Sequence, residues 1–281
     1  HCRLPQKTIW ERSLSTHRRT PGTCTARVTR SRSASKEFWD KLGKVAGDAA
    51  AIDPSDKAGR KNAYIALVRD LATHSGLTGV PNDGVLLDFG CGTGTFLSRF
   101  GLERPQIFAI GADISPVMLR NAIQRSPELL GRLFQYDGQR LPMADECLNA
   151  ITTGGVLLYF REDHEFRDIC DEFYRVLIPG GIVVAVEQVR AVALEDRENL
   201  KLQRSAKEIV ELFEAAGFIC EGWRQIRRGR FPLIYAIRYG LIPKKVYRLI
   251  AKLESFLWDR LGLPRYDYAD ATFLFRKRSI S

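Results

Sequence analysis

The sequence predicts an α/β fold: one open, doubly wound sheet of mostly parallel strands with helices on both faces. Two observations predict it. Short apolar runs alternate with helical apolar patterns along residues 81–228, the order that repeated β–α units produce. The apolar run at 85–87 also leads into a glycine-rich turn that opens a helix, as central strands of parallel sheets do. Because crossovers between parallel strands are right-handed, we expect the strand exits to share one edge of the sheet.

Two helices should precede the first strand. Apolar residues at helical spacing indicate the first helix, namely Phe38, Trp39, Leu42 and Val45. A second helix, capped by Ser55 or Asp56, carries one apolar face, made of Ala63, Tyr64, Leu67, Val68 and Leu71. We expect Trp39 and Tyr64 to pack in the core, with contact to a ligand as the alternative.

The sheet elements then follow in order. They are strand 84–88, helix 95–101, strand 106–112, helix 116–125, strand 132–136, strand 148–153, helix 164–177, strand 181–187, helix 205–216 and strand 218–226. A last strand at 271–276 alternates Phe273 and Phe275 against Leu274. Seven strands are therefore expected.

The turn after the first strand indicates a ligand site. Gly90, Gly92 and Gly94 remove Cβ atoms where a ligand can lie against the backbone, and the amides that open the next helix point into the same space. A dinucleotide-binding turn, G-x-G-x-x-G, would need its third glycine at position 95, which is Thr95. That interpretation fails by one residue.

Residues 88–94, Asp-Phe-Gly-Cys-Gly-Thr-Gly, instead resemble the first motif of class I S-adenosylmethionine-dependent methyltransferases. Three further segments resemble this family in the right order. They are the strand at 107–112 that leads to Asp113, the segment 134–146 with Asp137, and the helix-to-strand turn at 177–181. The resemblance covers roughly residues 80–190. Asn149 departs from it, because the family often has an aspartate there.

The resemblance implies a Rossmann-like sheet of seven strands whose last strand is antiparallel, and S-adenosyl-L-methionine as the cofactor. N-terminal helices would cover the donor pocket. It also implies a set of cofactor-binding residues, which are Asp88, Phe89, Gly90, Cys91, Gly92, Gly94, Asp113, Ile114, Asp137, Gly138 and Thr153. No metal site is expected.

Methyl transfer is an in-line displacement that needs aligned reactants in a dry site and little other machinery. An oxygen acceptor must lose a proton, and the candidates at the strand exits are Tyr159, His164 and Glu187. His164 is alternatively a helix-start residue, and Glu187 alternatively hydrogen-bonds the substrate without moving a proton. The expected acceptor is an oxygen of a small molecule, such as a sugar, polyketide, quinone precursor or lipid-like metabolite. A nucleic-acid methyltransferase and a non-catalytic adenosyl-binding scaffold are the alternatives.

Residues 229–270 separate the last two strands, where the family usually has a short hairpin. Apolar residues step by three and four from 244 to 261, with basic residues elsewhere on the wheel, so an amphipathic helix is expected. Eight aromatic residues lie in this insertion. We interpret it as a lid over the acceptor pocket or as additional core, with a membrane-surface helix as the alternative.

The net charge of +10 is concentrated at the N-terminus. Residues 1–35 hold eight Lys or Arg against Glu11, which is +7, and show no apolar periodicity. We expect a disordered basic tail or a transit-like segment there, so DNA is not expected as a partner and RNA is disfavoured. The cytoplasm is the expected location, or an organelle if the tail is a transit segment.

The expected organisation is one methyltransferase domain at 36–281 after the tail. Its parts are the N-terminal helices at 36–80, the donor-binding core at 81–228, the insertion at 229–270 and the closing strand at 271–278. Six cysteines without C-x-x-C spacing suggest neither a zinc site nor a disulfide framework. The most apolar stretch, 231–243, is interrupted by Arg238 and is too short to cross a membrane.

Overall fold

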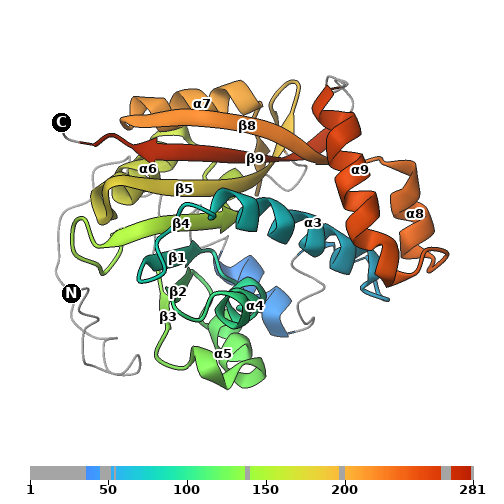
Figure 1. The fold of residues 1–281 in the computed structure, drawn as a ribbon, viewed down its shortest axis with the longest axis horizontal. Helices are drawn as coiled ribbons and strands as arrows, with labels where there is room; N and C mark the ends of the chain where they lie inside the picture. Colours follow the sequence, from blue (N-terminus) through green and yellow to red (C-terminus); the bar gives the residue numbers. More distant parts are fainter. Residues whose placement is uncertain are drawn as a thin grey trace.

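The structure, a computed structural model, confirms the open α/β sheet with an antiparallel last strand (Figure 1). It describes residues 36–44, 52–53, 55–136, 140–195, 200–260 and 267–279. Seven strands form the main sheet in the order β3-β2-β1-β4-β5-β9-β8. Their bounds are β1 (Val85–Phe89), β2 (Phe108–Asp113), β3 (Leu133–Gln135), β4 (Leu148–Gly154), β5 (Leu177–Arg190), β8 (Phe218–Arg228) and β9 (Tyr268–Lys277). Only β9 runs antiparallel to its neighbours among these described strands.

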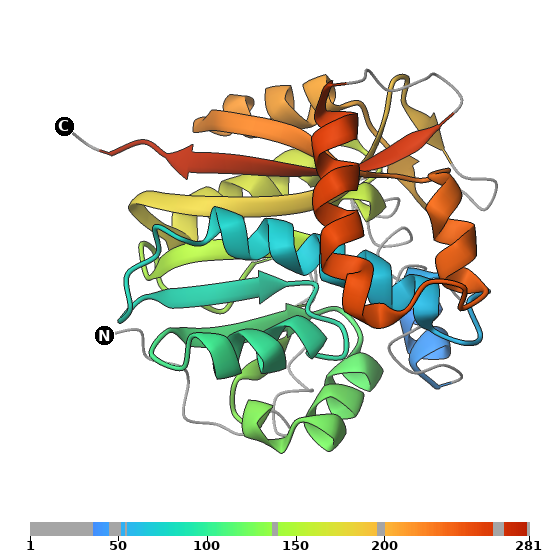
Figure 2. The ribbon, with the colours of Figure 1, turned by 45° about the vertical axis from the view of Figure 1, so that its right-hand side comes forward.

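Helices cover both faces of this sheet (Figures 1 and 2). They are α3 (Arg60–Gly76), α4 (Thr95–Glu103), α5 (Pro116–Arg125), α6 (Asp163–Val176), α7 (Ala206–Ala215), α8 (Pro232–Arg238) and α9 (Tyr247–Arg260). Shorter elements are the 3₁₀ turns η1 (Pro127–Leu129), η2 (Leu157–Tyr159) and η3 (Lys244–Val246), and a hairpin of β6 (Leu194–Glu195) and β7 (Leu202–Gln203).

Alternation along the strands explains the two cores. Leu86 points toward the face covered by α4 and α5, whereas Leu87 points toward the face covered by α6 and α7. Both side chains are fully buried. A central strand that is apolar on both faces is typical of a parallel sheet, so the sequence pattern and the packing agree.

The first helical segment, residues 36–44, is joined to the start of α5. The Ser115 hydroxyl donates to Asp40 Oδ1 at 2.6 Å, and the side-chain amide of Asn121 donates to the Gly43 carbonyl at 2.8 Å. The second helix, α3, begins at Arg60, a few residues after the predicted cap. Asp56 still provides an acceptor for one of the free amides in the first turn of α3, because Asp56 Oδ2 accepts from the Asn62 amide at 2.8 Å.

The insertion contains α8, η3 and α9, and the predicted amphipathic helix is present as α9. Tyr247, Ala251 and Glu254, which lie on one side of α9, are buried. The Tyr64 hydroxyl of α3 donates to Glu254 Oε2 at 2.5 Å, and the rings of Tyr64 and Tyr247 meet edge to face. The insertion therefore packs on α3, and Tyr64 is a core residue, as expected.

Within the residues that the structure describes, no helix combines the length and the apolar character needed to cross a lipid bilayer.

Candidate active site

The glycine turn between β1 and α4 has the backbone that its sequence requires. Gly90, Gly92 and Gly94 all have positive φ, at 75°, 54° and 71°. The amides of Gly90 and Cys91 donate to the Ala112 carbonyl of β2 at 2.7 and 3.0 Å. A Cβ added at Gly90 would clash with Val156, whereas one at Gly92 would meet no atom within 4 Å. Gly92 therefore faces open space.

Asp113, at the end of β2, holds the other side of this turn. Its Oδ2 accepts from the Gly92 amide and its Oδ1 from the Ser115 amide, both at 2.8 Å. Burial raises the pKa of Asp113 to about 6, although these amide bonds oppose the shift. Each carboxylate oxygen keeps a lone pair for a further donor. The carboxylate is thus positioned and ionised near neutral pH at the edge of a cavity.

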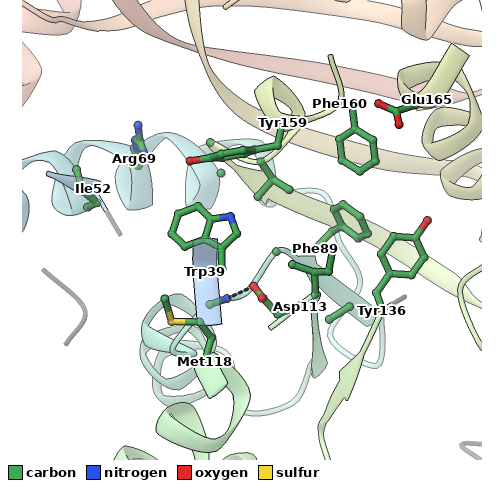
Figure 3. A pocket seen from close by; sticks show the side chains of 17 residues that line it. Trp39, Ile52, Arg69, Phe89, Asp113, Met118, Tyr136, Tyr159, Phe160 and Glu165 are labelled. Atoms are coloured by element: carbon green, nitrogen blue, oxygen red, sulfur yellow. Dashed lines mark hydrogen bonds between the residues drawn. The ribbon is translucent and has the colours of Figure 1, made fainter. Parts of the chain in front are cut away.

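That cavity lies at the carboxyl ends of β1, β2 and β4 and measures about 1070 Å³ up to its open mouth. Aromatic and apolar side chains dominate its wall (Figure 3). Its lining residues are Trp39, Ile52, Arg69, Phe89, Gly90, Gly92, Ala112, Asp113, Ile114, Met118, Tyr136, Gly154, Gly155, Val156, Tyr159, Phe160 and Glu165. Figure 3 shows Trp39 between Tyr159 and Asp113, with Met118 beside it. Neighbouring strand exits therefore meet, as the doubly wound topology requires.

A second cavity of about 1640 Å³ shares the glycine turn and Arg69 with the first. Asp88, Cys91 and Thr153 of the predicted cofactor set line it. Burial raises the pKa of Asp88 to about 7, although the Thr152 hydroxyl donates to its Oδ1 at 3.0 Å. The buried Thr153 hydroxyl has no hydrogen-bond partner in the structure. A ligand group could satisfy it.

Arg69 of α3 is the cation between the two cavities. Its Nε and Nη2 donate to the fully buried Asp270 of β9 at 3.2 and 3.3 Å, and Arg227 donates to the same carboxylate at 3.0 Å. One carboxylate thus faces two guanidinium groups, so this cluster retains one positive charge. Arg69 brings that charge to the cavity wall.

The three predicted proton acceptors lie in different environments. Tyr159 lines the first cavity, and its ring meets Trp39 edge to face at 5.4 Å. His164 is exposed in the first turn of α6 and lines neither of the two cavities. The structure therefore places His164 on the surface of α6 and not on the wall of either cavity.

Glu187 also has a different position from the one predicted. It is buried and lines neither of the two large cavities, and its Oε1 accepts from the amides of Val156 and Leu157 at 3.1 Å each. Burial raises its pKa to about 7. Glu187 thus fixes the loop after β4 and lies away from the walls of both large cavities.

Of the other predicted cofactor residues, Phe89 and Ile114 line the first cavity. Asp137 and Gly138 lie outside the described residues. Gly94 lines neither cavity and instead packs closely, since a Cβ there would approach Leu129 to 2.5 Å. Glycine is therefore needed at position 94 because the chain packs tightly there and has positive φ where α4 begins.

Sequence reasoning missed several contributors to the wall, among them Arg69, Met118, Glu165 and Tyr136. Arg69, Met118 and Glu165 carry no local signal, because each lies in a helix whose orientation only the tertiary fold determines. Trp39 was expected in the core, yet it lines the cavity. Tyr136 could have been found from its place at the end of the third strand.

The insertion does not reach this site in the part of the chain that is described. Neither cavity is lined by any residue of 229–260 or 267–270. The predicted lid is therefore not observed there, because α9 packs against β8 and α3. Tyr235 and Tyr239 are 54% and 73% exposed.

Comparisons with known proteins agree with this geometry. Residues 87–185 match the family described as "Methyltransferase domain". A demethylmenaquinone methyltransferase from Roseiflexus sp. (strain RS-1) is 33% identical over 119 residues, which are 42% of this chain and 49% of that protein. A tRNA (carboxymethyluridine(34)-5-O)-methyltransferase from Arabidopsis thaliana is 32% identical over 108 residues, 38% of this chain and 25% of that protein. The chain thus spans about half or less of these two relatives.

Among solved structures, geranyl diphosphate C-methyltransferase from Streptomyces coelicolor A3(2), in complex with Mg²⁺, geranyl diphosphate and S-adenosyl-L-homocysteine, shares the fold. Its TM-score is 0.59 at 14% identity, over 88% of this chain and 98% of that one. The strand order and the antiparallel β9 are those expected from the sequence. The chain therefore contains a methyltransferase domain, carried on the class I fold of S-adenosylmethionine-dependent methyltransferases that its sequence predicts.

Proposed function

We propose that this protein binds S-adenosyl-L-methionine and transfers its methyl group to an oxygen of a small, largely apolar molecule. One observation carries the proposal. The glycine turn and the Asp113 carboxylate open into the same aromatic-lined cavity that Tyr159 faces. Groups suited to an adenosyl donor and to an acceptor hydroxyl therefore share one wall.

The donor fits the residues on two counts. The space in front of Gly92 allows a ligand to lie against the turn, and the free lone pairs of Asp113 can accept from two neighbouring ribose hydroxyls. Ile114 and Met118, beside Asp113, supply apolar contacts for a base. Asp88 and Arg69 in the adjoining cavity are of opposite charge, as are the amino and carboxylate groups of a methionine moiety.

When bound, the donor supplies an electrophilic methyl group on a sulfonium. The chain's own part is to align the acceptor and exclude water, which aromatic walls do well. Tyr159 is the member of the predicted trio that faces the cavity, so we assign it to hydrogen-bond the acceptor hydroxyl. Its ring is held by Trp39 on one side, and Lys201 lies 5.6 Å from the ring centre.

A nucleic-acid acceptor is the second candidate, because several relatives carry tRNA methyltransferase names. The net charge of the sequence that contains the donor-binding core opposes it. Residues 36–228 contain 24 Lys or Arg against 28 Asp or Glu, a net charge of −4. Nucleic-acid binding draws its affinity from cationic contacts to phosphates, which this part of the chain supplies poorly.

An acceptor panel with methyl-labelled donor tests the proposal. The full chain is incubated with quinols, hydroxylated polyketides, isoprenoid alcohols, sugars and total tRNA, and label transfer is followed by mass spectrometry. We expect label in a small hydroxylated acceptor, attached to oxygen as judged by NMR, and much less label with Asp113→Ala at a donor concentration that does not saturate the variant. Label on a carbon atom would replace the oxygen assignment. Label only in tRNA, or donor binding without transfer to any class, would overturn the proposal.

A further inference from the structure

The outer side of the insertion is the most apolar exposed surface in the described parts of the chain. Fifteen large hydrophobic side chains are exposed in the described parts of the whole chain, and eight of them lie between residues 233 and 257. Six of these eight, together with four basic residues, form what we call the apolar–basic surface. Its apolar members are Tyr239, Leu241, Leu249, Leu253, Phe256 and Leu257, and its basic members are Lys244, Lys245, Arg248 and Lys252. Monomeric proteins seldom gather so many without a partner.

The packing of α9 explains why these residues face outward. The helix uses Tyr247, Ala251 and Glu254 to pack on α3, and Glu254 Oε1 also accepts from the Arg228 amide at 2.9 Å. Residues four apart lie on one face, so Leu249 and Leu253 lie together on the opposite side, at 69% and 50% exposure. The part of the predicted apolar stripe around Leu249 and Leu253 is therefore exposed, whereas Ile250 packs against the core.

Basic residues accompany this stripe. Residues 229–260 hold seven Lys or Arg against two Asp or Glu, a net charge of +5, and one of the two acids is the buried Glu254. Lys244, Lys245 and Arg248 are all exposed directly before or within the start of α9. The charge thus has the opposite sign to that of residues 36–228.

We propose that the apolar–basic surface binds the face of an anionic lipid bilayer, with α9 lying in the plane of the interface. Leu249, Leu253 and Phe256 would enter the acyl boundary, while the long Lys and Arg side chains reach back to phosphate groups. Arg260 already lies 4.1 Å from the centre of the Phe256 ring, a pairing of cation and apolar contact on the same side of the helix.

The charge also distinguishes this partner from others. A second copy of the chain would bring +5 against +5, and residues 1–35 carry +7, so neither complements the surface. Both cavities are lined by other elements in the described structure, so binding here leaves them accessible. Figures 1 and 2 show α8 and α9 together at one side of the molecule. A bilayer could contact that side without covering the sheet.

Co-sedimentation with vesicles tests the proposal on the full-length chain. We expect binding to phosphatidylcholine vesicles that contain about 30% phosphatidylglycerol, and little to pure phosphatidylcholine. Changing Lys244, Lys245 and Arg248 together to Glu should weaken partitioning at least about tenfold, because each cation near an anionic surface contributes favourably. Leu249→Ser with Leu253→Ser should weaken it by a similar factor.

Matched controls separate this surface from general effects. Arg120, Arg167 and Arg224, which are exposed elsewhere, are changed together to Glu, and Leu102→Ser is combined with Leu130→Ser. Circular dichroism and melting temperature confirm that every variant is folded. The proposal is overturned if the wild type ignores anionic vesicles, if the insertion variants bind as the wild type does, or if the controls lose as much. Binding that survives the insertion changes would assign it to residues 1–35 instead.

Discussion

Replacing Asp113 by alanine should weaken donor binding without unfolding the protein. The side chain accepts two amide hydrogen bonds at 2.8 Å, from Gly92 and Ser115, and presents its remaining lone pairs to the cavity. Asp113→Ala removes the acceptor for the ribose hydroxyls and loosens the glycine turn at once. Both effects act in the same direction.

The expected size follows from the charge on the carboxylate. A hydrogen bond to a charged group contributes about 1.5–3 kcal/mol, which corresponds to a loss of roughly tenfold to a hundredfold in donor affinity. Since burial raises the pKa of Asp113 to about 6, the ionised form predominates only above that pH. Wild-type affinity should therefore fall as the pH is lowered from about 7.5 to about 5, and the variant should lose this dependence.

Calorimetric titration with S-adenosylhomocysteine measures both effects. Asp83→Ala is the matched control, because Asp83 is an exposed carboxylate in the turn before β1, at the opposite end of that strand. It should bind as the wild type does. An affinity change below about twofold in Asp113→Ala, equivalent to less than 0.5 kcal/mol by the same relation, would refute the assignment of the ribose to this carboxylate.

Three further predictions concern the acceptor side, the insertion and its attachment. Tyr159→Phe keeps the ring against Trp39 but removes the hydroxyl, so it should lower turnover about tenfold at unchanged donor affinity; an unchanged rate would exclude the role. Tyr235→Ala and Tyr239→Ala should leave turnover and acceptor KM within about twofold of wild type, because neither side chain lines a cavity; a large change would restore the lid. Burial raises the pKa of Glu254 from 4.5 to about 7, so its contribution to stability is full below about pH 4.5 and is lost as the pH rises through about 7. Glu254→Gln should therefore be more stable than wild type at about pH 8, by roughly 1–3 kcal/mol in chemical denaturation, with a smaller difference at about pH 5; a variant less stable at both pH values would contradict this.

The local parts of the fold were predictable from sequence. The strand, the glycine turn and the helix after it need only an apolar run and residues that tolerate positive φ. Residues 85–95 supply both. Asp113 could be predicted because it directly follows an apolar run, and strand exits meet at one edge of a parallel sheet. All of these features are determined by residues that lie close together in the sequence.

The features that could not be predicted depend on contacts between segments that lie far apart in the sequence. Glu187 follows an apolar run as Asp113 does, but it lies within β5 and accepts from the amides of Val156 and Leu157, about thirty residues earlier in the chain. The apolar spacing of α9 does not decide which side of the helix packs on the rest of the protein. Glu254 decides it, because its hydrogen bonds to the Tyr64 hydroxyl of α3 and the Arg228 amide of β8 hold its side of the helix inward. No local pattern encodes either choice.

The central claim is that an adenosyl donor lies against the glycine turn, and Gly92→Val tests it most directly. A Cβ at Gly92 meets no protein atom within 4 Å, so the valine side chain would occupy the space assigned to the ligand. Gly131→Val is the matched control, because Gly131 also has positive φ and open surroundings but lies in the turn before β3, away from both cavities.

Titration calorimetry with S-adenosylhomocysteine should show saturable one-to-one binding to the wild type and to Gly131→Val, and no measurable binding to Gly92→Val with a native circular-dichroism spectrum. Unchanged affinity in a folded Gly92→Val protein, or no binding to the wild type, would contradict the account.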